Sequence, residues 1–162
     1  MLTLYGETLW ESPYVYSVFV ALREKGLAFD LKELDLQAGE QRQQPFAERS
    51  MVAKVPALDH DGFWLTESLA IVEYLDERFP SPEHPPVMPL GIEERARARQ
   101  LAGVLRSGLP HLVAERPTSS IVFDPMRTPL GDAAKADAAK LINMVERLLP
   151  SDSTALFMHW TF

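Results

Sequence analysis

The chain has 162 residues, of which 46% are hydrophobic and 24% are charged, as in an average globular protein. Its net charge of −7, without a clustered basic face, argues against nucleic acid as a partner, because phosphate binding needs such a face. The absence of cysteine excludes disulfides, thiolate metal sites and a dithiol redox mechanism. No charged N-terminal region precedes an apolar core, and no segment approaches about 18 uninterrupted apolar residues. We therefore expect a soluble cytoplasmic protein with no membrane partner.

The chain begins with a predicted strand, helix and strand. Residues 2–5 are a short β-prone run. Ser12 and Pro13 then favour the start of a helix, because serine is a strong N-cap and proline suits the first helical position. Apolar residues recur at helical spacing after them, and Gly26 stands where a C-terminal cap is expected. A second, less regular strand is predicted over 29–34.

A weak helix, a β-hairpin and a strong helix follow. Residues 39–48 are polar and weakly periodic, so we expect a poor, mobile helix there. The apolar runs 55–58 and 63–65 flank Asp61-Gly62, and this dipeptide between β-prone runs is a hairpin signal. A helix is predicted from Glu67 to about residue 79, and its last residues, 76–78, are interpreted as a solvated end. The element order is β-α-β-α-β-β-α, with the fourth strand antiparallel to the third.

The composition changes after residue 80. Five prolines fall between residues 80 and 89, and because proline removes amide donors and disfavours helix, residues 81–90 are predicted to be a linker. Residues 92–112 are typical of one long helix, residues 115–131 of a loop, and Asp132 caps a further helix that ends at Pro150. The sequence thus predicts an N-terminal domain over 1–80, a Pro-rich linker over 81–90 and a helical domain over 91–162.

One pair of motifs points to a family. Val55-Pro56-Ala57-Leu58 enters a strand through a proline, and Glu67-Ser68 opens a helix nine residues later. Unpaired strand groups beside a helix N-terminus make a peptide-sized anion site. With these motifs, the sequence resembles the glutathione transferase superfamily, whose domain carries V-P-A-L and then [EQ]-S-x-A-I. The resemblance covers residues 1 to about 160, and it is closest to the serine-type branch, including the zeta and tau classes and their bacterial relatives.

The resemblance implies a fold class. It is an α/β thioredoxin-like N-terminal domain (β-α-β-α-β-β-α) followed by a partial all-α C-terminal domain. In the family, the segment that matches 156–162 continues into Ala-Asp, which closes a capping box, whereas this sequence stops one residue past the cap. Met158-His159 also departs from the family pattern. We therefore expect a C-terminally truncated member whose helical domain leaves an apolar face open, as a liability or an interface.

The resemblance also implies a catalytic residue. Ser12 matches the serine of the family's S-P-[FY] motif, which donates a hydrogen bond to the glutathione thiolate at a helix N-terminus. The alternative is that Ser12 is only an N-cap, and the two roles are compatible. Tyr5 is the rival candidate, because tyrosine-type members use a tyrosine at the end of the first strand. Ser17 is a weaker candidate, since it lies a full turn into the helix.

The strand motif matches the family's binding site for the cysteinyl part of glutathione. The resemblance implies that Val55 pairs with it through backbone groups and that Pro56 follows a cis peptide bond. The alternative is an ordinary proline at the start of a strand. Lys54 matches the lysine of the family motif G-K-V-P. Residues 51–53 depart from the family's N-P-x-G, so the approach to the strand is expected to differ.

The two ends of glutathione have separate candidates. The resemblance implies that Glu67 accepts from the α-amino group and that Ser68 donates to the α-carboxylate, whereas an ordinary helix cap is the alternative. Gln41 matches the ligand of the glycyl carboxylate. The four histidines show no metal-ligand spacing, so no metal is expected.

Together these residues predict a glutathione transferase, a cytoplasmic detoxification enzyme with glutathione as co-substrate and a small electrophile as second substrate. Conjugation, a zeta-like cis–trans isomerisation and peroxide reduction all use the same thiolate, so the reaction stays open. The family implies a homodimer. The alternative is a non-catalytic module for dimerisation or regulation, and a third hypothesis is a chain that does not fold durably.

Overall fold

The computed structural model describes residues 1–148 of the chain. The chain divides into two compact units, Met1–Met88 and a second unit that begins at Pro89. Predictions that concern residues 149–162, including the family's capping-box position, lie outside the described residues.

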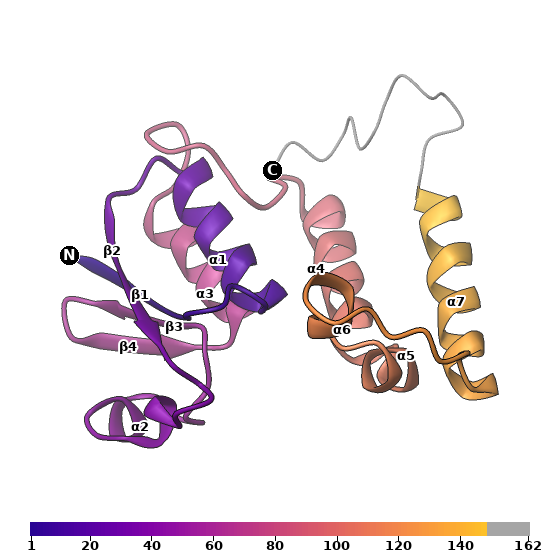
Figure 1. Cartoon of the computed structure of the whole chain (residues 1–162). Helices are drawn as coiled ribbons and strands as arrows, with labels where there is room; N and C mark the ends of the chain where they lie inside the picture. The colour runs from indigo at the N-terminus through magenta and orange to yellow at the C-terminus, as the bar shows by residue number, and fades with distance from the viewer. Residues whose placement is uncertain (149–162) are drawn as a thin grey trace. The chain divides into compact units, whose positions relative to one another are not determined.

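Unit 1 is built on a four-stranded mixed sheet with strand order β2-β1-β3-β4. The central strand β1 is parallel to β2 and antiparallel to β3, and β4 is antiparallel to β3, as predicted. In register, Tyr5 lies between Lys32 and Ala57, and Ala57 in turn pairs with Thr66. The strands are β1 (Leu2–Glu7), β2 (Phe29–Leu34), β3 (Ala57–His60) and β4 (Phe63–Thr66) (Figure 1).

Successive side chains of β1 point to opposite faces of the sheet, where they join two different hydrophobic clusters. Leu4 and its partner Leu58 face α1 (Pro13–Glu24) and α3 (Ser68–Arg78), where they are fully buried with Leu22, Ile71 and Leu75. Tyr5 and its partner Ala57 face the opposite side, which α2 (Phe46–Arg49) covers through Phe46. Figure 1 shows α2 on the far side of the sheet from α1 and α3.

The ends of α1 follow the sequence signals. The Ser12 side chain caps the first turn, Pro13 opens the helix, and Gly26 adopts φ +65° just beyond its end. Gly6 is also required, because a Cβ there would lie 2.9 Å from Cγ1 of Val15. The glycine thus lets α1 approach the end of β1 closely.

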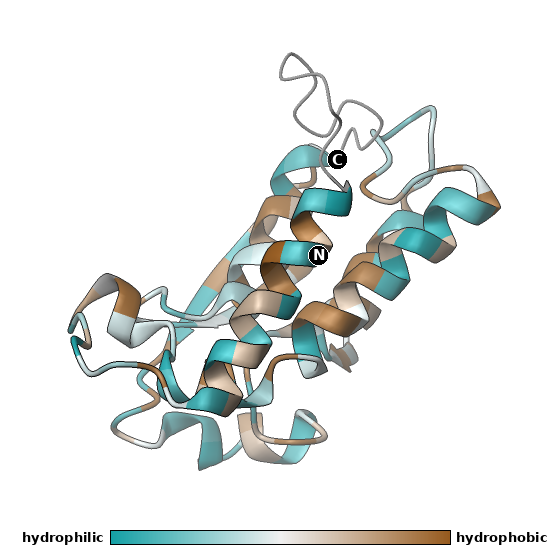
Figure 2. Cartoon of the chain, turned by 90° about the vertical axis from the view of Figure 1, so that its right-hand side faces the viewer, coloured by the Kyte–Doolittle hydropathy of each residue, from teal (hydrophilic) through white to brown (hydrophobic). Residues whose placement is uncertain are grey.

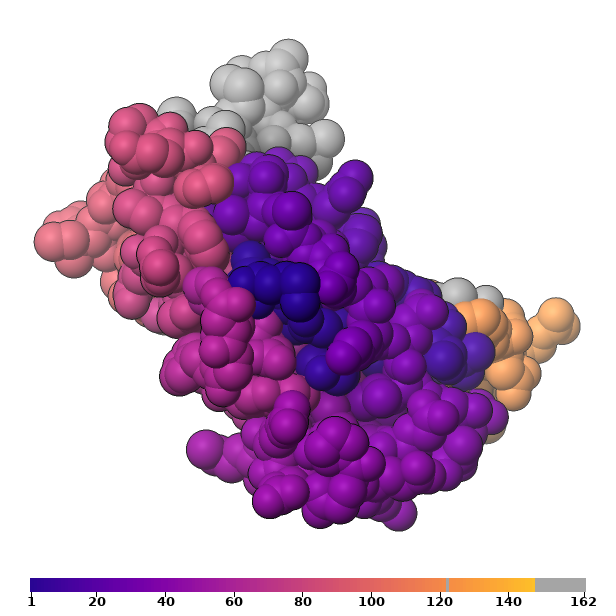
Figure 3. Space-filling model, turned by 90° about the vertical axis from the view of Figure 1, so that its left-hand side faces the viewer, coloured from indigo at the N-terminus to yellow at the C-terminus, as the bar shows by residue number. Residues whose placement is uncertain are grey.

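Two local features show opposite outcomes of the sequence analysis. Asp61 and Gly62 both have positive φ and form the turn between β3 and β4, as predicted. The Asp61 N–H also donates to the Met1 carbonyl at 3.1 Å, and Figure 3 shows the indigo N-terminus bordered by magenta residues. The single helix expected over 39–48 is instead two short pieces, η1 (Glu40–Arg42) and α2, because Pro45 lacks the N–H that would continue a helix.

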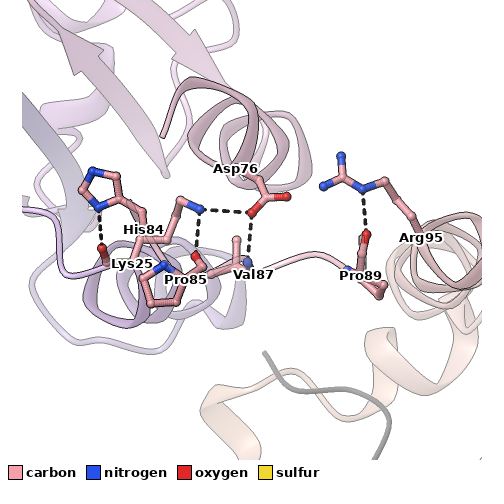
Figure 4. A network of polar contacts seen from close by, with 7 residues as sticks. All are labelled: Lys25, Asp76, His84, Pro85, Val87, Pro89 and Arg95. Carbon is pink, nitrogen blue, oxygen red and sulfur yellow. Dashed lines mark hydrogen bonds and ion pairs between the residues drawn. The ribbon is translucent and has the colours of Figure 1, made fainter. Parts of the chain in front are cut away.

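A buried ion pair fastens Pro85 and Val87, in the proline-rich segment, to the rest of unit 1 (Figure 4). Lys25 Nζ donates to Asp76 Oδ1 at 3.1 Å and to the Pro85 carbonyl at 2.9 Å. The Val87 N–H donates to the same Asp76 oxygen at 2.9 Å. The side chains of Lys25 and Asp76 are 0% and 3% exposed, so the prediction that α3 has a solvated end is wrong for Asp76. The partner that buries it lies 51 residues away in the sequence.

Unit 2 is helical in the part that the structure describes. The predicted helix over 92–112 is broken, because Gly108 ends one helix and Pro110 begins the next. Leu109, which precedes the proline, leaves the helical region with φ −130° and ψ 45°. The loop predicted over 115–131 contains one short turn of helix. The helices are α4 (Ile92–Ser107), α5 (Pro110–Glu115), α6 (Ser119–Val122) and α7 (Asp132–Leu148).

Within unit 2, α5 packs against α7 and is capped by it. The buried Asp137 carboxylate accepts from the N–H groups of His111 at 2.9 Å and Leu112 at 3.2 Å. Burial alone raises the pKa of Asp137, but these hydrogen bonds, with the charges of Lys140 and His111, outweigh it and lower the pKa. In the same unit, Arg95 Nε donates to the Pro89 carbonyl at 3.0 Å (Figure 4).

The helices are amphipathic, as the brown and teal segments along single helices in Figure 2 show. On α7, Ala134 and Asp137 are buried, whereas Ile142 and Val145 are 57% and 37% exposed. None of the helices within residues 1–148 is long and apolar enough to cross a membrane. Among the same residues, no cluster of three or more His, Asp or Glu could hold a metal ion.

Candidate functional site

The topology of unit 1 brings four connections to one end of the sheet. β1 and the parallel β2 both end there, β3 begins there because it is antiparallel to β1, and β4 ends there. The register Tyr5–Ala57–Thr66 fixes this alignment. The connections at this end carry all the site residues that the sequence predicts: Ser12, Gln41, Lys54, Val55, Pro56, Glu67 and Ser68.

Ser12 lies half-buried at the N-terminus of the 12-residue helix α1. Its Oγ accepts from the Val15 N–H at 3.3 Å, and its own N–H donates to Glu7 Oε1 at 2.8 Å. Because Oγ is used as an acceptor, the hydroxyl proton is left to donate, and residues 1–148 supply no acceptor for it. The hydroxyl can therefore donate to an anionic ligand where the helix dipole also favours negative charge.

The two rival hydroxyls are differently placed. Tyr5 is only 9% exposed, and its ring packs at 4.8 Å from Trp64 and 5.4 Å from Phe46 on the α2 face of the sheet. Its hydroxyl accepts from Lys32 Nζ at 3.4 Å, and Tyr5 is one of the residues that line a hollow of about 290 Å³. Ser17 is exposed, and its hydroxyl donates to the Tyr14 carbonyl at 2.8 Å.

The strand motif lies at the entrance to β3. The Val55–Pro56 peptide bond is cis, as expected. Val55 is partly buried against the cluster of Tyr5, Phe46 and Ala57, and Pro56 is buried. Lys54 is exposed beside them. The neighbouring residue Ala53 has φ +48°, a left-handed conformation that a side chain rarely adopts.

Glu67 and Ser68 form the junction between β4 and α3. Glu67 has φ 70° and ψ 111°, and its carbonyl accepts from the Ile71 N–H at 2.9 Å, which closes the first helical turn. Its side chain is exposed, whereas Ser68 is buried. A non-glycine residue in such a backbone conformation costs about 1–3 kcal/mol and is typical of ligand sites. The junction thus presents a carboxylate and a helix N-terminus together.

Gln41 lies in the single turn of η1. Its amide nitrogen is 3.5 Å from the Leu36 carbonyl, and its amide oxygen is buried without a partner among residues 1–148. Such an orphaned amide group is typical of a side chain that completes its hydrogen bonds with a ligand or water.

The sequence analysis missed Glu7. Glu7 is 5% exposed at the end of β1, and its carboxylate accepts from the N–H groups of both Ser12 and Trp10. The available signal was an acidic residue that ends an apolar strand shortly before an N-cap serine. Charged residues are almost never fully buried unless paired, so this position indicates a fixed loop.

Comparison with known proteins identifies the two units. A family model described as glutathione S-transferase, N-terminal domain, matches residues 9–83, and one described as glutathione S-transferase, C-terminal domain, matches residues 91–162. A probable maleylacetoacetate isomerase 2 from Drosophila melanogaster is 33% identical over 105 residues, which are 64% of this chain and 45% of that protein. Glutathione S-transferase 1 from Dianthus caryophyllus is 35% identical over 101 residues, with 62% and 44% covered.

A solved structure agrees with these relatives. The crystal structure of a glutathione transferase homolog from Burkholderia, with bound glutathione, is 38% identical and has a TM-score of 0.76, covering 93% of this chain and 68% of that one. The chain spans about half the length of the curated relatives it matches. The predicted fold class, a thioredoxin-like domain followed by a helical domain, is confirmed. The chain belongs to the glutathione S-transferase family.

Proposed function

We propose that this protein binds glutathione and stabilises its thiolate for attack on a small, soft electrophile. The observation that carries the proposal is the Ser12 hydroxyl, which stands at the N-terminus of α1 with its oxygen already accepting from Val15 N–H. The hydroxyl proton is then left to donate to a ligand. In glutathione, the atom that such a hydrogen bond would stabilise is the negatively charged sulfur of the thiolate.

Ser12 acts as a hydrogen-bond donor and not as a base, because a serine alkoxide is far more basic than a thiolate. A hydrogen bond to a charged group contributes about 1.5–3 kcal/mol. Since one pKa unit corresponds to about 1.4 kcal/mol, this bond lowers the pKa of the bound thiol by about one to two units. The thiol proton leaves to solvent, and the N-terminus of α1 adds favourable potential for the remaining charge.

The other residues hold the tripeptide in place. Val55 pairs with the cysteinyl part through its backbone, and Pro56 shapes that edge. Glu67 accepts from the α-amino group, while Ser68 donates to the α-carboxylate at the start of α3. Gln41 and Lys54 bind the glycyl end. Holding the sulfur in one orientation lowers the entropic cost of bringing it into position for attack.

The reaction is proposed by analogy with the relatives. Proteins named glutathione S-transferase and proteins named maleylacetoacetate isomerase match the chain at similar identity. Conjugation and cis–trans isomerisation both begin with the same thiolate, so Ser12 serves either reaction. We place the enzyme in the cytoplasm as a homodimer. The competing proposal is a glutathione transferase-like module that regulates or dimerises without catalysis.

The test is Ser12→Ala, measured by conjugation of glutathione to chloro-dinitrobenzene and by calorimetric titration of glutathione. We expect kcat/KM to fall about 10- to 100-fold, which is one to two lost pKa units, while the dissociation constant changes little. Ser17→Ala is the matched control, because it removes an exposed hydroxyl from the same helix and is expected to retain activity.

Two outcomes contradict the proposal. Full activity in Ser12→Ala, with loss in Tyr5→Phe, assigns the thiolate to the tyrosine. A folded chain that neither binds glutathione nor turns over supports the non-catalytic module.

A further inference from the structure

The loop between β1 and α1 is held by a single buried carboxylate. Glu7 Oε1 accepts from the Ser12 N–H at 2.8 Å, and Glu7 Oε2 accepts from the Trp10 N–H. Each carboxylate oxygen thus binds one backbone amide of the loop. With 5% of its surface exposed, Glu7 makes these bonds largely shielded from water, where hydrogen bonds to a charged group are strong.

Trp10 gives the loop a second attachment. Its backbone has φ +55°, a conformation that a bulky residue adopts only when its surroundings impose it. Its indole nitrogen donates to Glu33 Oε1 on β2 at 2.7 Å, and its ring packs edge-on against Phe19 at 5.1 Å. The loop is therefore fixed to two strands and to α1.

The contacts of this loop also fix the position of Ser12. The Ser12 N–H is bound to Glu7, and the Ser12 Oγ is bound to Val15 N–H, so both the main chain and the side chain of this residue are fixed. Fixing both leaves the hydroxyl proton one principal direction in which to donate.

We propose that Glu7 is a positioning residue that orients the Ser12 hydroxyl toward the glutathione sulfur. The inference rests on the proposed role of Ser12 and adds to it a residue that does not touch the ligand. Glu7→Gln is expected to break one of the two hydrogen bonds to the loop. A glutamine amide has a single acceptor oxygen, so its NH₂ group would face the second backbone N–H, donor against donor.

Two effects of Glu7 on the thiol have opposite signs, which makes the test sharp. As a negative charge, Glu7 disfavours a nearby thiolate, so its removal alone lowers the pKa of the bound thiol. As a positioning residue, Glu7 favours the thiolate through Ser12, so its removal raises that pKa. We expect the second effect to dominate, since the two amide donors already compensate the carboxylate.

The experiment is a double-mutant cycle of Glu7→Gln and Ser12→Ala in the full chain. The readouts are kcat with chloro-dinitrobenzene, the calorimetric dissociation constant of glutathione and the pKa of the bound thiol, followed by the ultraviolet absorbance of the thiolate. In the wild-type background, we expect Glu7→Gln to lower kcat about 10- to 100-fold, as a misplaced group does, and to raise the thiol pKa by about one unit. In the Ser12→Ala background, the same substitution is expected to have almost no further effect.

Glu33→Gln is the matched control. It removes one negative charge from the same loop environment but keeps an acceptor for the Trp10 indole, so kcat and thiol pKa are expected to stay at wild-type values. If Glu7→Gln prevents folding, Glu7→Asp replaces it in the cycle, because the shorter carboxylate retains the charge and shifts only the geometry.

The outcomes separate the two proposals. Equal losses from Glu7→Gln with and without Ser12, or a lowered thiol pKa, overturn the positioning role and leave the function of Ser12 intact. Wild-type activity in Ser12→Ala overturns the proposed function and this inference with it.

Discussion

At the scale of single residues, two of the four non-glycine residues with positive φ among residues 1–148 differ in what this conformation serves. Glu67, with φ +70°, places its carboxylate at the start of α3, where its proposed role in binding glutathione accounts for the strain. Ala53, with φ +48°, offers no functional group and lies in the approach to β3. This is the position where the family pattern has glycine, so the departure seen in the sequence has a structural cost.

Ala53→Gly is therefore expected to stabilise unit 1. The left-handed conformation costs an L-residue about 1–2 kcal/mol, and glycine returns about 0.5–1 kcal/mol of that through its greater freedom in the unfolded chain. The net gain is up to about 1.5 kcal/mol, which thermal unfolding followed by circular dichroism measures as a higher Tm. Ala70→Gly, at an exposed helical position in α3, is the control and is expected to lower the Tm. A lower Tm in Ala53→Gly would show that the side chain makes a contact that outweighs the strain.

At the scale of elements, local signals could be predicted from the sequence and distant partners could not. Ser12-Pro13, Gly26 and Asp61-Gly62 are short-range signals, and each marks a real helix end or turn. The order of elements along residues 1–80 and the antiparallel pairing of β3 with β4 followed from such signals.

The errors have different origins, and in one of them a contact far along the chain decides the outcome. Asp76 is buried by Lys25, 51 residues away, and nothing in its own neighbourhood marks the pair. Glu7 is fixed by amides of a loop whose path the sequence does not show. The break between α4 and α5 is different, because Gly108, which ends α4, and Pro110, which begins α5, are both visible in the sequence. The sequence analysis placed the strand motif beside a helix N-terminus, whereas the individual roles of the site residues rest on the resemblance to the family.

The short helix α5 depends on another element. With six residues it is too short to be stable alone, and Asp137 of α7 supplies its N-terminal cap. The folded-state pKa of Asp137 is below its ordinary value, with burial opposing the shift and the two N–H donors outweighing it. A depressed folded pKa contributes stability above the unfolded pKa of about 3.9, and this contribution is lost as the pH falls through the folded pKa.

Asp137→Asn is expected to lower the Tm of unit 2 at neutral pH and to reduce its loss of stability in acid. The measurement is thermal unfolding by circular dichroism across the acidic range, in the variant and the wild type. Asp124→Asn, at an exposed carboxylate in the loop before α7, is the control and should leave the pH dependence unchanged. An unaltered acid dependence in Asp137→Asn would mean that other carboxylates control it.

At the scale of the whole molecule, the proposed binding of glutathione can be tested separately from the recognition of the second substrate. All seven proposed glutathione residues lie within the first 68 residues and therefore inside unit 1. On this proposal, glutathione recognition requires only unit 1 to be folded, whereas no residue of it is proposed to bind the electrophile. On this proposal the chain can bind glutathione without catalysing a reaction. The change in thermal stability on adding glutathione measures this binding without an activity assay.

Glutathione is expected to raise the melting temperature of unit 1 in proportion to the logarithm of its concentration. At about 100 times the dissociation constant, a ligand that binds only the folded state adds about 2.7 kcal/mol. For a unit of this size, each kcal/mol corresponds to about 4–8 °C, so the shift is about 10–20 °C if unit 1 unfolds on its own. Differential scanning calorimetry with increasing glutathione measures it. Glu67→Gln, which weakens the partner of the α-amino group, should reduce the shift, and an oxidised or S-blocked glutathione separates sulfur contacts from backbone contacts. An enzyme gives both the shift and turnover, a regulatory module gives the shift alone, and a chain with no shift at saturating glutathione is not a glutathione-binding protein.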